Sequence, residues 1–305
     1  MGQRSCPAFL WGHGVTGFLD RVKNLPMLGI GVSTEYGANT SGEGLDVAKL
    51  RRDYPRFSAF LEVGVEVAKG LDADTRAWRA AGGQTTYHFL DINLDEPADF
   101  DPAWLASVNG LITELSPAWL CGDAGLWHFG ARDRGQMLLL PPILSAGSAD
   151  AMAAGIANLR AETGHEVLPE NPPGTLFLGD LHLLDFFARV CERGDTGMLL
   201  DCAHLAVYQR IAGHRPLDGL EGFPLDRVVE LHVAGGGHRD HQGFAWVEDD
   251  HSVEVLEDTW AIYDHVVARA PNLRAVVFEC ERNPLAKTLA GFERIASAWR
   301  AAGTP

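Results

Sequence analysis

Short apolar runs alternate with longer amphipathic segments along most of the chain. The apolar runs have the length of buried strands, and the segments between them carry apolar residues at helical spacing. The predicted strands cover residues 27–33, 57–65, 84–93, 118–123, 166–170, 197–202, 227–234 and 274–280. The predicted helices cover residues 45–53, 71–81, 102–115, 148–163, 180–193, 204–212, 254–269 and 287–301.

This alternation predicts a barrel of the α/β class. Strands that are apolar on both faces, separated by amphipathic helices, are typical of a parallel sheet whose outer face is covered. Eight strand and helix units fit a (β/α)8 TIM barrel better than an open doubly wound sheet, which usually begins with a Gly-rich phosphate turn. Gly29-Ile30-Gly31 is too short for that turn. Because no linker rich in Pro, Gly or Ser interrupts the pattern, we expect one domain over residues 1–305, with residues 1–26 as an arm across it.

Charge and composition narrow the partners. Arg and Lys number 25 against 41 acidic residues, a net charge of -16 that repels phosphate backbones and disfavours nucleic acid. The longest apolar run, residues 137–144, falls far short of the ~20 residues that cross a bilayer, so we expect no membrane span. No signal peptide pattern opens the chain. Five cysteines without a CxxC pair indicate reduced thiols in a cytoplasmic protein.

Six predicted strands end in a side chain that can bind a metal: His88, Asp123, Glu170, Asp201, His232 and Glu279. A barrel gathers the carboxyl ends of its strands at one mouth, so these residues become neighbours. The loop after the seventh strand adds Asp249 and His251, and His204 follows Asp201 by three positions. Taken alone, a strand-end carboxylate is usually a cap and a lone histidine usually a core residue. Six such coincidences in one barrel instead predict a site.

The chemistry of this set favours metal ions. Several carboxylates in one mouth repel each other unless cations neutralise them. Imidazole and carboxylate ligands without a cysteine cluster suit iron, manganese, zinc or cobalt. Because eight or nine ligands exceed what one ion holds, two or three ions that share bridging carboxylates are expected.

The residues around these positions resemble a known family in order and approximate spacing, over about residues 27–285. The matching pieces are Tyr87-His88, residues 168–172 (LPENP), Leu199-Leu200-Asp201, residues 230–235 (ELHVAG), Asp249-x-His251 and Phe278-Glu279. They resemble the multinuclear non-haem iron-dependent oxidative enzymes, whose members include the methanobactin-maturing oxidase and the 3-thiaglutamate-biosynthesis oxidase.

The resemblance implies a TIM barrel of the xylose-isomerase-like type with two or three irons at its mouth, as Fe2+ and Fe3+. It implies an oxidoreductase that uses O2 to modify a residue, Cys, of a ribosomally synthesised precursor peptide, with a small partner protein that presents the peptide. One ferrous ion would bind oxygen and a neighbouring ferric ion the substrate thiolate or amide. The ligands would be His88, Asp123, Glu170, Asp201, His232, Asp249, His251 and Glu279.

Two positions depart from the family's pattern. Ala124 follows Asp123 where the family has a histidine, and His128 can replace that histidine only if its loop folds back. His204 stands where the family has an asparagine, three residues after the carboxylate of the sixth strand. A third ion is therefore either lost or held by His204.

Other functions use the same barrel. A xylose-isomerase-like sugar isomerase or epimerase with manganese or cobalt also needs His and carboxylates at strand ends, but no oxygen. Zinc endonucleases share this geometry, and the charge of -16 disfavours them. A non-catalytic peptide-binding protein with a degenerate site is the third alternative. For the oxidase, residues 235–248 are expected to be a long loop that covers the peptide substrate.

Overall fold

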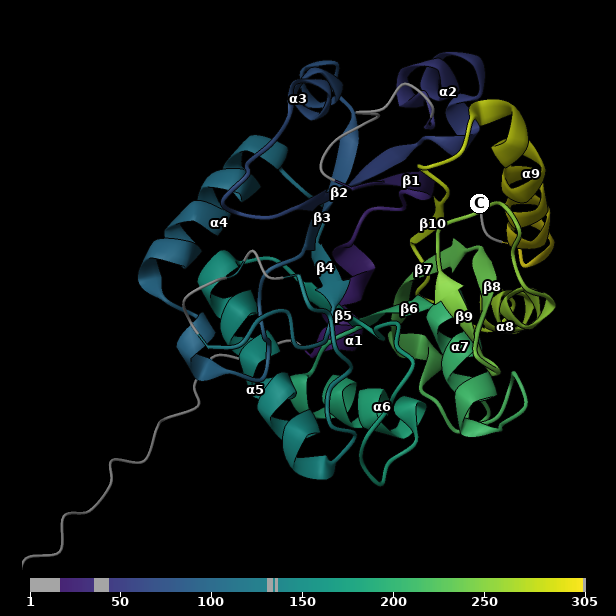
Figure 1. Cartoon of the computed structure of the whole chain (residues 1–305). Coiled ribbons are helices and arrows are strands. Elements are labelled where there is room, and N and C mark those ends of the chain that lie inside the picture. Colours follow the sequence, from purple (N-terminus) through teal and green to yellow (C-terminus); the bar gives the residue numbers. More distant parts are fainter. Residues whose placement is uncertain (1–16, 36–43, 131–133, 135–136, 304–305) are drawn as a thin grey trace, which may run out of the picture.

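The computed structural model describes residues 17–35, 44–130, 134 and 137–303. Eight parallel strands of this part form a closed barrel, seen end-on in Figure 1. The strands are β1 (Gly29–Glu35), β2 (Phe60–Val65), β3 (Gln84–Phe89), β4 (Leu120–Asp123), β5 (Val167–Glu170), β6 (Met198–Asp201), β7 (Val228–Ala234) and β10 (Ala275–Glu279). They neighbour one another in the order β1-β10-β7-β6-β5-β4-β3-β2. The predicted (β/α)8 barrel is confirmed.

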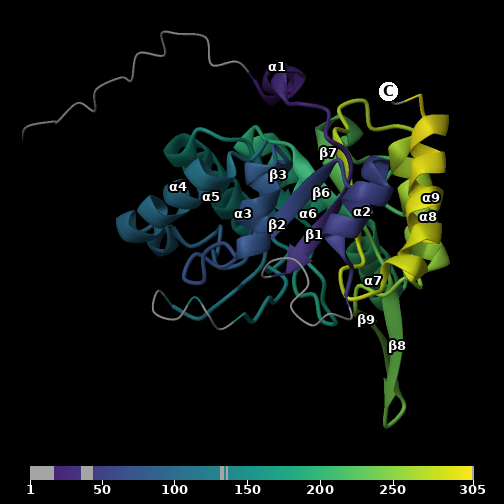
Figure 2. The same ribbon diagram turned by 90° about the horizontal axis from the view of Figure 1, so that it is seen from above.

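Helices cover the outside of the barrel (Figure 1). They are α2 (Val47–Asp53), α3 (Ala73–Ala80), α4 (Pro102–Leu115), α5 (Ala146–Thr163), α6 (Leu183–Gly194), α7 (Cys202–Ala212), α8 (Glu257–Val267) and α9 (Leu285–Ala301), whereas α1 (Phe18–Arg21) lies at one end of the barrel (Figure 2). Side-chain caps fix where several of them begin: Asp72, Asp101 and Ser145 each accept a hydrogen bond from a first-turn amide. Among the described residues, no helix combines the length and apolar character that crossing a bilayer requires.

Two apolar cores lie on the two sides of the barrel wall. The larger core fills the space between strands and helices and includes Cys202 and Cys280. The smaller core fills the amino-terminal end of the barrel interior and includes Trp119 and Cys121. Cys121 therefore points inward, as strand alternation predicts, and the other two thiols point toward the helices.

The amino-terminal end of the barrel is closed by α1. Phe18 and Val22 are fully buried in the smaller core, and Arg21 pairs with Glu166 and Asp195 at its edge. The expected arm over residues 1–26 stays a prediction: α1 belongs to this segment, and residues 1–16 lie outside the described residues.

The prediction of a loop over residues 235–248 is wrong. The segment forms an antiparallel hairpin of β8 (Gly236–His241) and β9 (Phe244–Asp249). Gln242 and Gly243 connect the strands and both have positive φ, 54° and 83°, as a type I′ turn requires. Figure 2 shows the hairpin projecting from the barrel on the side opposite α1.

We expect Phe18→Ala to destabilise the protein strongly, because Phe18 is fully buried at the closed end of the barrel. Phe-to-Ala changes in cores cost about 3–5 kcal/mol. Leu19→Ala is the matched control on the same helix, since Leu19 is 42% exposed, and it should change stability by no more than about 0.5 kcal/mol. Urea unfolding followed by circular dichroism measures both, and equal losses would contradict the closing role of Phe18.

Candidate metal centre

The strand ends bring the predicted residues to one mouth. In the barrel register Asp123 lies beside Glu170, and Asp201 lies beside His232. Consecutive strand residues point to opposite sides, so these four side chains share the inner face. Gly122 has a φ of 154°, and a Cβ there would lie 2.6 Å from the Phe89 ring. Glycine therefore permits β4 to approach the end of β3, where His88 stands.

Glu170 lies at the centre of the cluster. Its Oε2 is 2.8 Å from His88 Nε2, and its Oε1 is 3.3 Å from His232 Nδ1 and 3.6 Å from His204 Nδ1. One fully buried carboxylate thus faces three imidazole rings that come from β3, β7 and α7. If metal ions bind at the mouth, Glu170 would be among the residues that hold them.

The hairpin delivers the outer part of the cluster. Asp249 ends β9, and its Oδ2 lies 3.1 Å from His204 Nε2 and 3.2 Å from His251 Nε2. His251 Nε2 also lies 3.8 Å from Glu279 Oε2. His251 has a φ of 50°, a left-handed conformation that is rare outside glycine and that concentrates at functional sites.

All nine predicted residues therefore meet at the mouth, and their role as metal ligands stays a prediction. Among the described residues four sets have ligand atoms within 4.8 Å of one another: His88, Asp123 and Glu170; Glu170, Asp201 and His204; Glu62, His232 and Glu279; and, deeper in the barrel, Glu62, Cys121 and Glu230. Glu170 belongs to two of the sets. The arrangement fits more than one ion better than one.

Unpaired buried atoms support metal binding at the mouth. Within the described part of the chain, these side-chain atoms of the cluster have no partner in hydrogen-bonding geometry: Asp123 Oδ1, Asp201 Oδ2, His232 Nδ1, Asp249 Oδ1 and Glu279 Oε2. Leaving a buried polar atom unsatisfied costs about 1–3 kcal/mol. Cations coordinated by these oxygens and by imidazole nitrogen would remove that cost, so the donor set fits metal binding.

The pKa shifts of residues at the mouth also support metal binding. Burial and the charge of Glu170 hold the pKa of Asp123 well above its usual range, and burial and Glu279 raise the pKa of Asp201 to about 7. Burial alone would lower the pKa of His88, but its hydrogen bond with Glu170 and the charge of Glu62 raise that pKa to about 9. Without a cation the cluster retains protons near neutral pH. Metal binding would release them.

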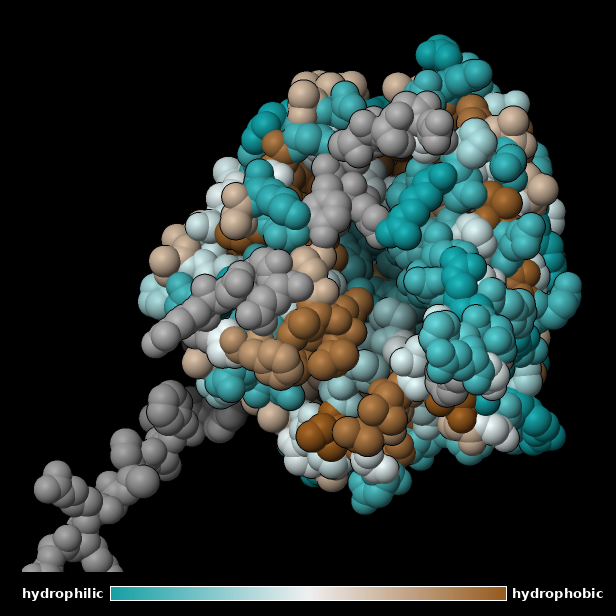
Figure 3. Space-filling model, in the orientation of Figure 1, coloured by the Kyte–Doolittle hydropathy of each residue, from teal (hydrophilic) through white to brown (hydrophobic). Residues whose placement is uncertain are grey.

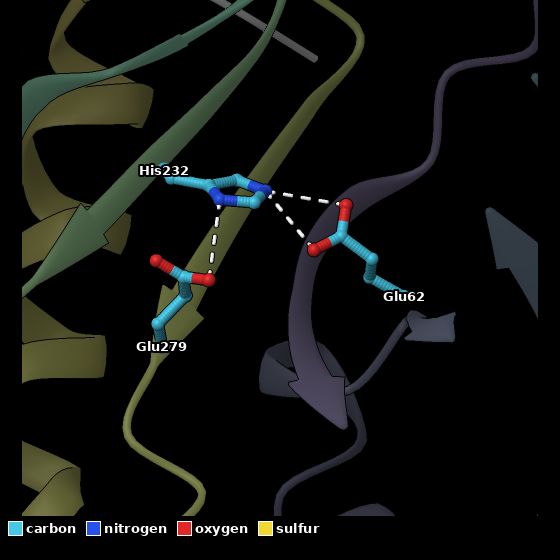
Figure 4. Close-up of side chains that lie close together, drawn as sticks. All are labelled: Glu62, His232 and Glu279. Carbon is cyan, nitrogen blue, oxygen red and sulfur yellow. Dashed lines mark hydrogen bonds and ion pairs between the residues drawn. The ribbon is translucent and has the colours of Figure 1, made fainter. Parts of the chain in front are cut away.

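Glu62 is a site residue that the sequence prediction missed. It lies within β2 and points into the barrel, and its Oε1 and Oε2 are 3.1 and 3.2 Å from His232 Nε2. Figure 4 shows Glu62 and Glu279 on opposite sides of the His232 ring, with Glu279 Oε1 3.4 Å from Nδ1. If Nε2–H donates to Glu62, the lone pair of Nδ1 faces Glu170 and Glu279. Histidine ligands of metals are commonly fixed in this way.

Glu281 has a comparable place beside His251. Its Oε1 lies 2.5 Å from His251 Nδ1, and its Oε2 accepts a hydrogen bond from Ser33 Oγ at 3.1 Å. His251 Nε2 is then directed toward Asp249. The sequence offers one signal for each missed residue: Glu62 is a lone carboxylate in an apolar run, and Glu281 follows Glu279 by two positions.

The two positions that depart from the family's pattern, Ala124 and His204, differ in what the structure shows. His128 does not replace the missing histidine at Ala124, because its ring is buried with Nε2 3.0 Å from Asp99 Oδ2 and Nδ1 2.6 Å from the Gly130 carbonyl oxygen. His204 does enter the cluster, where its Nδ1 lies 2.9 Å from the Asn171 carbonyl oxygen. Asp201 caps α7 and accepts a hydrogen bond from the His204 amide, which places that ring at the mouth.

Fold and site together define a (β/α)8 barrel with a histidine and carboxylate centre at its mouth. The family described as RiPP precursor modification enzyme MbnB/TglH/ChrH matches residues 48–300, and the chain belongs to this family. Its members are described as enzymes that modify precursor peptides.

Proteins described as UPF0276 proteins are similar to this chain in sequence. One from Caulobacter vibrioides is 27% identical over 269 residues, 81% of this chain and 92% of the relative. One from Rhizorhabdus wittichii is 28% identical over 187 residues, 60% of this chain. That alignment covers 64% of the Rhizorhabdus relative. A third relative, from a Caulobacter species, is 31% identical over 47% of this chain, and the alignment covers 51% of that relative.

Solved structures confirm the fold. A xylose isomerase-like TIM barrel protein from Mycobacterium smegmatis, in complex with magnesium, has a TM-score of 0.55 at 11% identity and covers 92% of this chain and 98% of its own. An L-ribulose 3-epimerase has a TM-score of 0.52 at 13% identity and covers 90% of this chain and 96% of its own. At these identities the likeness shows the fold alone.

We expect Glu170→Gln to lower the metal content of the purified protein, because the neutral amide removes the charge that three imidazole rings share. Glu166→Gln is the matched control, four positions earlier and at the closed end, where Glu166 pairs with Arg21. Elemental analysis by mass spectrometry gives the metal per chain. Equal metal in Glu170→Gln and the unaltered protein would place the centre elsewhere.

Glu62→Leu should weaken metal binding about 10–100-fold, the usual effect of losing a group that orients a histidine ligand. Glu62→Gln should retain most of the affinity, because its amide oxygen can still accept a hydrogen bond from His232 Nε2–H. Competition with a chromophoric chelator measures both. Equal losses would show that the charge of Glu62 matters and that its hydrogen bond to His232 does not.

Proposed function

We propose that this protein is an iron-dependent oxidase that uses O2 to modify a residue, Cys, of a ribosomally synthesised precursor peptide. Membership of a family of precursor-modifying enzymes supports the substrate class. The observation that carries the proposal is the set of buried, unpaired ligand atoms at the mouth of the barrel. A small partner protein that presents the peptide and a cytoplasmic location belong to the same proposal.

The nine residues His88, Asp123, Glu170, Asp201, His204, His232, Asp249, His251 and Glu279 would hold two or three ions. Bound iron would supply the one-electron chemistry that O2 requires and a Lewis acid for the thiolate of the substrate. Carboxylate and imidazole ligands suit iron, and also manganese, zinc and cobalt, so the choice of iron rests on the oxidative reaction.

The cavity over the cluster fits one side chain. Its volume is about 210 Å³, below the roughly 300–1,000 Å³ of typical small-molecule sites. Ligand candidates form its floor, and its walls include Leu90, Trp127, Leu139 and Pro173. Trp127 is held by two hydrogen bonds, from its amide to Asn93 Oδ1 and from Nε1 to the Asp123 carbonyl oxygen. These apolar walls would exclude water from a cysteine side chain that enters from a peptide lying outside.

The test is reconstitution of metal-free protein with one metal at a time. With ferrous iron, air and a Cys-containing precursor peptide encoded beside its gene, we expect O2 uptake and a change in peptide mass that tracks it. The same peptide with Cys replaced by Ser is the control and should remain unchanged. The assay is run with and without the product of the adjacent small gene, the candidate presenting partner.

Other outcomes identify the alternatives. Conversion of a ketose by the manganese or cobalt form without O2 would show the sugar isomerase or epimerase. Peptide binding with metal far below one ion per chain would show a non-catalytic binding protein. Either result would overturn the oxidase.

A further inference from the structure

An apolar groove opens beside the metal cavity. Its volume is about 620 Å³, and its walls include Leu126, Leu140, Ile143, Leu176, Leu178 and Trp246. Ile143, Leu176 and Leu178 are 59%, 66% and 58% exposed. Figure 3, which looks into the mouth, shows hydrophobic side chains gathered below the central hollow. In a chain with a net charge of -16, a contiguous apolar surface of this kind marks a binding site.

The groove and the cavity are neighbours. Leu139, Pro173 and Asp249 line both. A chain lying in the groove would therefore pass directly beside the cluster, and one of its side chains would reach the cavity.

The edge of a strand forms one wall of the groove. Four consecutive residues of β9, Trp246 to Asp249, line it. Because neighbouring side chains of a strand point to opposite faces, contact with four in a row means that the groove follows the edge of β9 and not one of its faces.

The edge of β9 that lines the groove carries backbone amide and carbonyl groups that do not pair with β8. Among the described residues, β9 pairs with β8 and with no other strand. His241 and Phe244 flank the two-residue turn and form the closing hydrogen-bonded pair of the ladder. Pairs then alternate, so the amide and carbonyl groups of Ala245, Val247 and Asp249 point away from β8. An isolated two-stranded hairpin is marginally stable in water, and a third strand would stabilise it.

We propose that this groove binds an extended apolar segment of the peptide substrate, next to the residue that is modified, as a strand added to β9. The inference rests on the proposed function for the identity of the ligand as a peptide. Backbone pairing with β9 would give affinity independent of sequence, and the exposed leucines would select apolar side chains. The segment would be held in register with the cavity, because Asp249 ends the strand and belongs to the cluster.

Binding is measured on metal-free protein, so it does not depend on the oxidase reaction. The probe is a neutral, fluorescently labelled peptide of alternating Leu and Thr, long enough to span the six residues of β9. The double variant Leu176→Asp and Leu178→Asp should weaken binding about tenfold or more, because a carboxylate at either position cannot bury apolar area against the peptide. Leu217→Asp, at an exposed leucine outside the groove, is the control and should leave binding unchanged.

Two peptides test the strand pairing itself. Methylating the backbone nitrogens of alternate residues blocks one edge of the peptide, and shifting the methyl groups by one residue blocks the other. One peptide should retain its affinity and the other should lose it. Equal affinities, or unchanged binding in the double variant, would overturn the proposal. So would a dimer in solution that the double variant converts to a monomer, because the groove would then hold a second copy of this chain.

The two proposals fail in different ways. If the peptide binds the groove but no metal form consumes O2, the oxidase is wrong and the groove stands. If the iron form modifies a peptide and the double variant does so with an unchanged KM, the groove is wrong and the oxidase stands.

Discussion

The mouth of this barrel depends on the neutralisation of buried carboxylates. Burial of a charged carboxylate is costly unless an opposite charge or a metal compensates it. Glu170 is compensated within the protein by the imidazoles of His88, His232 and His204, and His232 holds its pKa below the usual range despite burial. The histidines lie farther from Asp123 and Asp201, with His204 Nδ1 3.8 Å from an oxygen of each, and burial raises the pKa of both carboxylates despite these contacts. The histidines balance part of the negative charge, and bound cations would balance the rest.

The barrel extends this polar character below the mouth. Glu62 lies between His232 and Cys121, whose Sγ is 3.2 Å from Glu62 Oε2. One layer lower, Glu230 accepts a hydrogen bond from Trp119 Nε1 at 2.6 Å, and burial and Glu62 raise its pKa to about 8. A column of polar side chains therefore runs down to the apolar core that α1 closes. Within this column Glu62 contacts His232 above it and accepts a hydrogen bond from Cys121 Sγ.

The sequence predicts most of the barrel and most of the side chains that meet at its mouth for one reason. Strand period and strand order decide where a strand-end residue points, so Asp123, Glu170 and Glu279 are placed without knowledge of the loops. This rule does not identify Glu62, because Glu62 lies within a strand and not at its end. A single carboxylate in an apolar run does not indicate which residue it contacts. The position of the His128 ring could not be predicted either, because it depends on contact with Asp99 from a different part of the chain.

The hairpin shows how a wrong local prediction can leave a site intact. Gln-Gly is a weaker turn signal than Asn-Gly, and the polar strand His238 to His241 has no apolar alternation to reveal it. Asp249 and His251 still reach the cluster, because the hairpin begins and ends next to β7 and returns the chain to the mouth. The paired strands add what a loop would lack, a strand edge that ends at Asp249. A ligand that pairs with this edge would contact the same short segment that positions Asp249 and His251, so its binding would be mechanically linked to the geometry of the cluster.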